Sequence, residues 1–277
     1  MNMSSKLQQT DCVGDLTACA VGPRDVSSRT FMDIHDNGVE IVFPPDKRQQ
    51  VTVTTEYPWN MVGQLIMRFP NGDYYSGTGT LVDKTHVLTA AHNVYGHDFG
   101  GEATDVWFVP ARNGSVQPYG SVQASKFFFP QAYRKQALPS PLALDGNIDD
   151  MKHYENDYAV IRLSSPLNLP YIAMYAASDE ELTSTTAGIT GYPSDQAFGT
   201  MWSASGNVSV EDFGLLGYKI DTYKGESGAS LMMSFEDPSG LVSAGIHVAG
   251  SREHNSNFAV RLTHERITHI ERWIDSE

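Results

Sequence analysis

The feature that most constrains the fold is a series of short β-rich runs separated by turn residues. From Met61 onward the runs recur at strand-like intervals, with Gly and Pro between them. They span residues 61–69, 77–82, 106–109, 158–163, 187–191, 218–220 and 241–248. Many short strands punctuated in this way are typical of a β-sandwich or β-barrel, so we expect an all-β body.

The two ends of the chain depart from this pattern. Ile267, Ile270 and Ile274 repeat with helical spacing and Thr263 can serve as N-cap, which predicts a C-terminal helix over 263–276. Residues 1–40 have weak periodicity and many Ser, Asp, Thr and Gly residues, which predicts a loosely ordered N-terminal arm or pro-segment.

Composition and charge narrow the class of protein. The 277 residues contain no uninterrupted apolar run of about 18 residues, the length that a membrane span needs. The formal net charge of -14 would repel phosphate, so we expect neither a nucleic-acid nor a membrane partner. Residues 1–10 lack the apolar stretch of a signal peptide. We expect a secreted protein whose export signal has been removed, with a cytoplasmic location as the alternative.

Metal and disulfide sites are not expected in the body of the protein. Cys12 and Cys19 both lie in the arm, either free or locally bridged. The irregular stretch 131–156 holds Asp145, Asn147 and Asp149 with the spacing of a calcium loop, but Asp150 replaces its turn glycine and Asn156 its glutamate. We expect a solvated acidic surface loop there, and cation binding stays an alternative.

A candidate nucleophile lies in Gly225-Glu226-Ser227-Gly228. A reactive serine needs an exposed hydroxyl on a tight turn, with backbone N–H groups converging on the developing oxyanion. Residues without a Cβ allow that approach. Taken alone, the same four residues are also an ordinary turn.

Two other segments offer partners for Ser227. His92 ends Leu88-Thr89-Ala90-Ala91-His92, where small residues allow a packed bend between strands. Asp157 opens the apolar run 158–163 and would be largely buried, a costly placement unless its carboxylate accepts hydrogen bonds. An imidazole meets that need, and the aspartate in turn fixes the tautomer that can accept the serine proton.

The chain order His92, Asp157, Ser227 differs from the orders of subtilisin and the α/β-hydrolases. With its Thr-Ala-Ala-His, Asn-Asp-x-Ala and Gly-x-Ser-Gly segments, the chain resembles the chymotrypsin-like serine endopeptidases. The resemblance implies two orthogonal six-stranded β-barrels with the three residues in the cleft between them. The protease domain would span 41–277, with the first barrel at about 58–165 and the second at about 185–262.

The resemblance also implies the chemistry. His92 takes the proton as Ser227 attacks the scissile carbonyl, the backbone N–H groups of Gly225 and Ser227 stabilise the oxyanion, and water hydrolyses the acyl-enzyme. No cofactor and no metal is required. The expected partners are protein or peptide substrates, and the chain is expected to be a monomer.

A narrower resemblance is to the glutamyl endopeptidases, carried by Arg48–Pro58 and Thr190–Pro193. It implies that His247 and Thr222 line the pocket for the substrate side chain. A hydroxyl and an imidazole suit a carboxylate, so cleavage after Glu, and less readily after Asp, is expected.

Two acidic residues leave the specificity open. Asp221 lies six residues before Ser227, the spacing at which trypsin-like enzymes place the aspartate that binds Lys or Arg. Specificity for Arg or Lys through Asp221 is therefore an alternative. In a Glu-specific enzyme, Asp221 would point away from the substrate or be neutralised by its neighbours. The second acidic residue, Glu226, directly precedes the candidate nucleophile, where many glutamyl endopeptidases carry an amide.

The resemblance also suggests activation by cleavage. Counting back from Arg48, the mature amino terminus falls at Ile41, and the preceding Glu40 would let a Glu-specific enzyme process itself. The freed amino group of Ile41 could pair with Glu226, which resembles the acidic partner in trypsin-like zymogens, or help to bind a substrate carboxylate. The alternative is an ordinary bond in an exposed arm.

Two other classes of function compete with a peptidase. A catalytically silent protease-like binding module would not need the complete Ser, His and Asp set, and an esterase would not need the side-chain pocket of Thr222 and His247. The remaining histidines are expected to be surface residues without a role. They are His35, His86, His97, His153, His254, His264 and His269.

Overall fold

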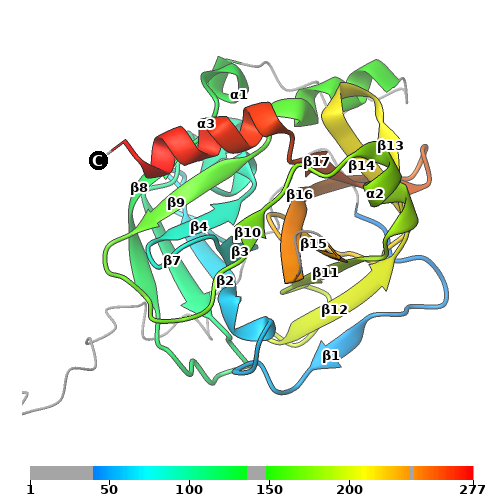
Figure 1. Ribbon diagram of the computed structural model, residues 1–277. Helices are drawn as coiled ribbons and strands as arrows, with labels where there is room; N and C mark the ends of the chain where they lie inside the picture. Colours follow the sequence, from blue (N-terminus) through cyan, green and yellow to red (C-terminus); the bar gives the residue numbers. More distant parts are fainter. Residues whose placement is uncertain (1–39, 136–147, 237–239, 277) are drawn as a thin grey trace, which may run out of the picture.

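The structure, a computed structural model, describes residues 40–135, 148–236 and 240–276, most of them in β-strands arranged in two units (Figure 1). Residues 1–39, with Cys12 and Cys19, lie outside the described residues, as do Asp145 and Asn147. The expectations for the arm, the cysteines and the calcium-like spacing therefore stay predictions.

The first unit is a closed six-stranded antiparallel barrel in the order β2-β3-β4-β9-β8-β7. Alternate strand residues such as Leu65, Met67, Phe108 and Ile161 point inward and form its core. Its strands are β2 (Val62–Arg68), β3 (Tyr74–Leu81), β4 (His86–Thr89), β7 (Asp105–Pro110), β8 (Val122–Phe128) and β9 (Ala159–Leu163). A small sheet of β5 (Tyr95–Gly96) and β6 (Gly101–Glu102) lies between β4 and β7 in the chain.

The second unit is a curled nine-stranded sheet in the order β1-β12-β11-β15-β16-β17-β14-β13, with β10 paired to β16 (Figure 1). The sheet has more than the expected six strands: β11 to β17 are already seven, and β1 and β10, from segments outside the predicted second barrel, join them. Its strands are β1 (Gln49–Val51), β10 (Ala173–Met174), β11 (Ala187–Gly191), β12 (Met201–Gly206), β13 (Val208–Glu211), β14 (Leu215–Tyr218), β15 (Ser230–Phe235), β16 (Gly240–Ser251) and β17 (Ser256–Arg261).

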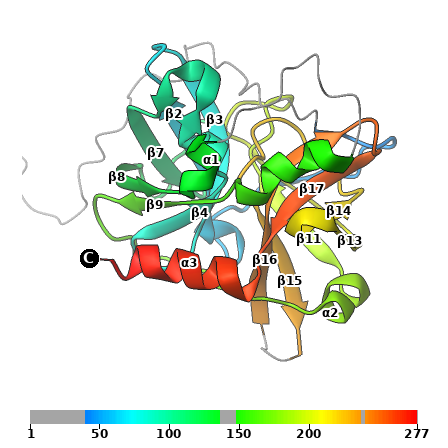
Figure 2. The same ribbon diagram turned by 90° about the horizontal axis from the view of Figure 1, so that it is seen from above.

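Apolar packing joins the two units and the C-terminal helix. Leu88 and Val160 of the barrel share one core cluster with Phe258 and Val260 of the sheet and with Ile270. Ile270 belongs to α3 (His264–Ile274), which the Thr263 side chain caps, as the sequence predicts. Figure 2 shows α3 extending from the second unit toward β9 of the first.

Two short helices were not expected from the sequence. α1 (Gln131–Lys135) lies in the predicted acidic loop, and α2 (Asp179–Ser184) opens with a capping box between Ser178 and Glu181. Within the described parts of the chain, no helix is long and apolar enough to cross a bilayer.

The segment after Glu40 is fixed to the second sheet. β1 pairs with β12, and the buried Arg48 guanidinium binds Asp195 through two hydrogen bonds of 2.9 and 2.6 Å. Arg48 also binds the nearby Asp46. The residues that follow Glu40 therefore lie along the body of the protein.

Candidate active site

The pairing of β4 with β9 brings His92 and Asp157 together. Thr89 lies opposite Ala159 in this antiparallel register, so the residues just after β4 and just before β9 meet at one end of the barrel. The Asp157 carboxylate, wholly buried, lies 2.7 Å from Nδ1 of His92 and accepts the backbone N–H of His92 at 3.0 Å. This contact favours the tautomer with hydrogen on Nδ1, which makes Nε2 a proton acceptor.

Ser227 lies on a glycine-flanked turn between β14 and β15. Gly225 and Gly228 have φ values of +97° and +89°, in the left-handed region. A Cβ on Gly225 would meet the carbonyl of Tyr192, and one on Gly228 would meet the hydroxyl of Thr89. Both positions therefore require glycine.

Hydrogen bonds fix this turn to the barrel beside His92. The Ser227 carbonyl accepts the Nδ2–H of Asn93 at 2.8 Å and the backbone N–H of Thr78 at 3.0 Å. Asn93 directly follows His92. Asn93 therefore holds the Ser227 turn next to the segment that carries His92.

The Ser227 hydroxyl has an unexpected acceptor, the carboxylate of Glu40. Ser227 Oγ donates to Glu40 Oε1 at 2.9 Å, and Nε2 of His247 lies 3.2 Å from the same oxygen. Glu40 is only 8% exposed although it carries a carboxylate. The residue predicted to precede the cleavage site therefore occupies the space between the predicted nucleophile and the predicted pocket histidine.

The backbone beside Glu40 is held as tightly as its side chain. The Ile41 N–H donates to Oδ1 of Asn257 and the Ile41 carbonyl accepts Nδ2–H of Asn257, each at 2.8 Å. The Thr222 N–H also donates to that carbonyl, at 3.3 Å. Asn257 is wholly buried and was not found from the sequence, because its partners are distant in the chain and it belongs to no motif.

Thr222 joins this arrangement through its backbone N–H. Its side chain is completely buried. Among the described residues, its hydroxyl and Oε2 of Glu40 are buried polar atoms that have no hydrogen-bond partner. A buried donor without an acceptor is costly, so the hydroxyl is suited to bind a further polar group in this pocket.

Asp221 is turned toward the N-terminal segment. Its carboxylate accepts the backbone N–H of Phe43 at 2.6 Å and that of Lys47 at 2.8 Å. Only 2% of the residue is exposed. Both carboxylate oxygens thus already accept hydrogen bonds from residues 43 and 47.

Glu226 is buried beside Ser227 and does not contact Ile41 in the uncut chain, where the Ile41 N–H goes to Asn257. One Glu226 carboxylate oxygen accepts the Tyr223 N–H at 2.8 Å. Burial raises the pKa of Glu226 well above its ordinary value of 4.5, and the negative charge of Glu40 raises it further.

This raised pKa predicts a pH-dependent stability. Above the ordinary value the unfolded chain loses the Glu226 proton while the folded chain retains it, so the free energy of unfolding falls as pH rises through this window. Glu226→Gln keeps an acceptor for Tyr223 and removes the ionisation. In an uncut Ser227→Ala background, we expect it to raise the melting temperature by roughly 2 to 4 °C near neutral pH and much less near pH 4.

The matched control is Glu211→Gln, which changes an exposed carboxylate. It is expected to leave the melting temperature within about 1 °C at either pH. Equal effects of Glu226→Gln at both pH values would show that Glu226 does not titrate as its burial predicts.

Two other histidines are less exposed than the sequence suggested. His86 is 4% exposed, and its Nδ1 lies 2.7 Å from the Asp83 carboxylate. His153 is 9% exposed and packs against the ring of Tyr154. Neither is among the residues that contact Ser227.

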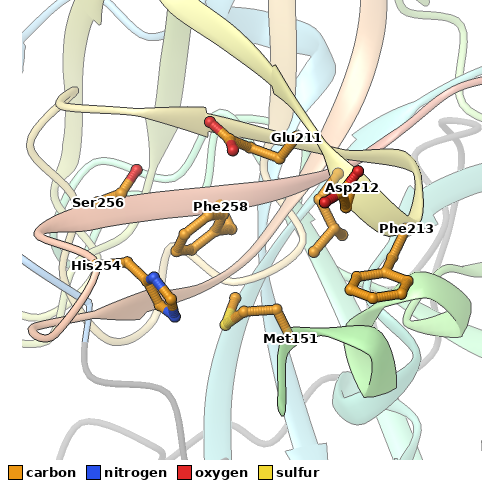
Figure 3. A pocket seen from close by; sticks show the side chains of 8 residues that line it. Met151, Glu211, Asp212, Phe213, His254, Ser256 and Phe258 are labelled. Carbon is orange, nitrogen blue, oxygen red and sulfur yellow. The ribbon is translucent and has the colours of Figure 1, made fainter. Parts of the chain in front are cut away.

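A separate hollow of about 140 Å³ lies near β16 (Figure 3). Ser256 and Phe258 of β17 line it, and they pair with Ser251 and Ala249 of β16, the strand that carries His247. In Figure 3, His254 and Phe213 lie at opposite ends of the hollow, with Met151 between them. None of the predicted site residues lines it.

Metal-ligating side chains do not gather at the site. Within residues 40–135, 148–236 and 240–276, no group of three or more His, Cys, Asp or Glu side chains could hold an ion.

The chain is similar in sequence and in fold to known proteins. Residues 77–234 match the trypsin-like peptidase domain. A glutamyl endopeptidase of Bacillus licheniformis is 31% identical over 86% of this chain and 70% of its own. A protein of Bacillus subtilis named extracellular metalloprotease is 29% identical over 82% of this chain and 68% of its own. The solved structure of a Glu endopeptidase in complex with MPD superposes with a TM-score of 0.68, at 26% identity, over 86% of this chain and all of that one.

Proposed function

The chain belongs to the trypsin-like peptidases, as a serine endopeptidase related to the glutamyl endopeptidases, and we propose that it cleaves protein or peptide substrates after Glu and less readily after Asp. We also propose that it is secreted, as the name of the Bacillus subtilis relative describes that protein. Its monomeric state stays a prediction.

The proposed roles follow from the contacts at the site. Ser227 is the nucleophile, His92 the general base, and Asp157 the group that orients the imidazole and stabilises the imidazolium. The Gly225 and Ser227 N–H groups bind the oxyanion. The acyl-enzyme on Ser227 is then hydrolysed by water that His92 activates.

The observation that carries the Glu preference is the bound carboxylate of Glu40. This side chain stands in for the glutamate of a substrate, since it presents the same carboxylate to His247 at 3.2 Å. The pocket accepts it with only 8% of the residue exposed. A buried carboxylate is tolerated where hydrogen-bond donors reach it, and His247 and the Ser227 hydroxyl lie within hydrogen-bond distance of Glu40 Oε1 here.

The position of Asp221 supports the same specificity. An aspartate that binds a substrate Lys or Arg must present its carboxylate to the pocket. Asp221 instead accepts hydrogen bonds from the N–H groups of Phe43 and Lys47. These two donors stabilise the negative charge of the carboxylate without a cation. This placement disfavours trypsin-like specificity.

We also propose that the chain is a zymogen cut between Glu40 and Ile41. The Ser227 proton is committed to the Glu40 carboxylate, and Glu40 fills the pocket that a substrate side chain would enter. Cleavage releases Glu40 together with residues 1–39. The new amino group of Ile41 then lies beside Asn257, close to the pocket, with Glu226 as a second acceptor.

The experiment that tests the specificity uses mature protein beginning at Ile41 and four peptides that differ only at the cleaved position. We expect kcat/KM to decrease in the order Glu, Asp, Gln, Lys, with Glu preferred over Gln by roughly 10-fold to 100-fold, the value of a hydrogen bond to a charged group. His247→Ala should remove most of this preference. Faster cleavage after Lys than after Glu would show that Asp221 governs the pocket.

A further inference from the structure

We propose that Tyr218 is a positioning residue for substrate recognition. Its hydroxyl donates to Nδ1 of His247, so the ring hydrogen is on Nε2 and this imidazole can donate to the substrate carboxylate. The inference rests on the proposed preference for Glu. It concerns the same pocket, but adds a residue that no sequence motif marks.

The two side chains meet inside the second sheet. The Tyr218 hydroxyl, from β14, lies 2.6 Å from Nδ1 of His247, from β16. His247 is completely buried and Tyr218 is 3% exposed. The backbone of His247 is fixed by hydrogen bonds with Gly228 and Ala229, at 2.7 and 2.8 Å, so the ring has little freedom to move away.

Nδ1 of His247 has two polar neighbours. The Phe258 carbonyl, 3.2 Å away, can only accept a hydrogen bond, so it favours hydrogen on Nδ1. The Tyr218 hydroxyl can donate as well as accept, so it also allows a lone pair on Nδ1 with hydrogen on Nε2. In the neutral imidazole, donation by Tyr218 to Nδ1 therefore goes with hydrogen on Nε2, and donation by Nδ1 to Phe258 goes with a lone pair on Nε2.

The carboxylate at Nε2 shows which arrangement serves binding. Oε1 of Glu40 lies 3.2 Å from Nε2, and a carboxylate cannot donate to a lone pair there. Hydrogen must therefore be on Nε2 for attraction. The shorter contact, at 2.6 Å, is with Tyr218, which donates to Nδ1 in that tautomer.

Tyr218 is suited to remain a donor. Burial raises the pKa of its hydroxyl well above the ordinary value, and the charges of Glu40 and Glu226 raise it further. The hydroxyl hence keeps its hydrogen across the working pH range. A neutral His247 can then bind a carboxylate without being protonated to the imidazolium.

The groups around His247 come from four parts of the chain. Glu40 faces Nε2 from the N-terminal segment, Tyr218 faces Nδ1 from β14, and the neutral Phe258 carbonyl faces Nδ1 from β17. On the turn before β15, Ser227 reaches the same Glu40 oxygen, and the Glu226 carboxyl, when ionised, raises the pKa of Tyr218.

The test compares Tyr218→Phe with the wild type, both as mature protein beginning at Ile41. Without the hydroxyl, the Phe258 carbonyl draws the hydrogen to Nδ1, so neutral His247 presents a lone pair to the substrate. We expect KM for a Glu peptide to rise about 10-fold to 100-fold with kcat little changed, and the Glu over Gln preference to fall to about 1 or to reverse. A Gln side chain can donate to that lone pair.

The pH profile gives a readout that a merely structural role would not move. In Tyr218→Phe, carboxylate binding requires the imidazolium, so KM for the Glu peptide should rise with pH, while the wild-type value stays nearly flat. Tyr75→Phe is the matched control, since Tyr75 is also 3% exposed and its hydroxyl accepts a hydrogen bond, from Asn71 in the first barrel. It should leave KM and the preference unchanged.

Ring ¹⁵N shifts of His247 in the uncut Ser227→Ala protein measure the tautomer directly and do not depend on whether Tyr218→Phe folds. Hydrogen on Nε2 alone supports the inference, and hydrogen on Nδ1 overturns it. An unchanged Glu over Gln ratio in a folded Tyr218→Phe protein also overturns it. A wild type without any Glu preference would instead refute the proposed specificity.

Discussion

Ser227→Ala is expected to lower kcat for peptide hydrolysis about a million-fold and to leave the fold intact. The variant removes the atom that forms the acyl-enzyme, so that water must attack the substrate directly. The glycine turn does not depend on the hydroxyl, because its anchoring bonds come from Asn93 and Thr78 to the Ser227 carbonyl. The measurements are kcat on the mature protein, labelling by a fluorophosphonate probe, and the melting temperature.

Ser234→Ala, an exposed serine later in β15, is the control and should keep full turnover and labelling. Turnover of Ser227→Ala above about 1% of wild type would show that another residue is the nucleophile. A wild-type mature protein that neither labels nor hydrolyses peptides would be a silent binding module. One that hydrolyses simple esters but no peptides would be an esterase.

The local sequence pattern is enough to predict the surroundings of a residue where a strand or a helix fixes its neighbours. Asp157 is expected to be buried because it opens an apolar strand, and to need a partner for the same reason. The structure shows the carboxylate wholly buried and 2.7 Å from His92. The capped C-terminal helix is likewise predicted from its spacing and its N-cap, and is confirmed at His264–Ile274.

Contacts between distant residues could not be predicted in this way. Glu40 reaches Ser227 and His247 across 187 and 207 positions of sequence, and nothing local marks it as buried. β1 and β10 have only three and two residues, too short for any periodicity. The sequence predicts only that Tyr218 lies in a strand. It does not show which atom lies opposite the Tyr218 hydroxyl, and the proposed role depends on that atom.

Glu40→Gln is expected to leave the chain uncut between residues 40 and 41 and to hold peptidase activity below about 1% of that of the mature enzyme. A Glu-specific enzyme should cut after Gln roughly 10-fold to 100-fold more slowly, as the hydrogen bond to a charged carboxylate is lost. The substituted amide side chain has nearly the same shape as the carboxylate and still fills the pocket. Intact mass and activity after incubation with mature wild-type enzyme measure both effects.

Two variants isolate the reason for the loss. Glu56→Gln changes an exposed glutamate in the same N-terminal segment and should mature normally. Glu40→Lys places a trypsin site at the same bond, so brief trypsin treatment should restore the Ile41 amino terminus and the activity. If uncut Glu40→Gln is as active as the mature wild type, cleavage is not required and the zymogen proposal is wrong, while the assignment of Ser227 survives.

The contact between Ser227 and Glu40 also predicts which molecule makes the proposed cut. Ser227 touches the side-chain oxygen of Glu40, whereas attack would require the main-chain carbonyl carbon at that position. The Ile41 N–H and carbonyl are meanwhile held by Asn257 and Thr222. In the proposed zymogen, a chain in this arrangement is not placed to hydrolyse its own bond, so we expect an already mature molecule to cut it when the segment opens. Activation should therefore accelerate with enzyme concentration, and mature wild type should process the Ser227→Ala chain at Glu40. A half-time independent of protein concentration would instead show that the segment rearranges and is cut within one molecule.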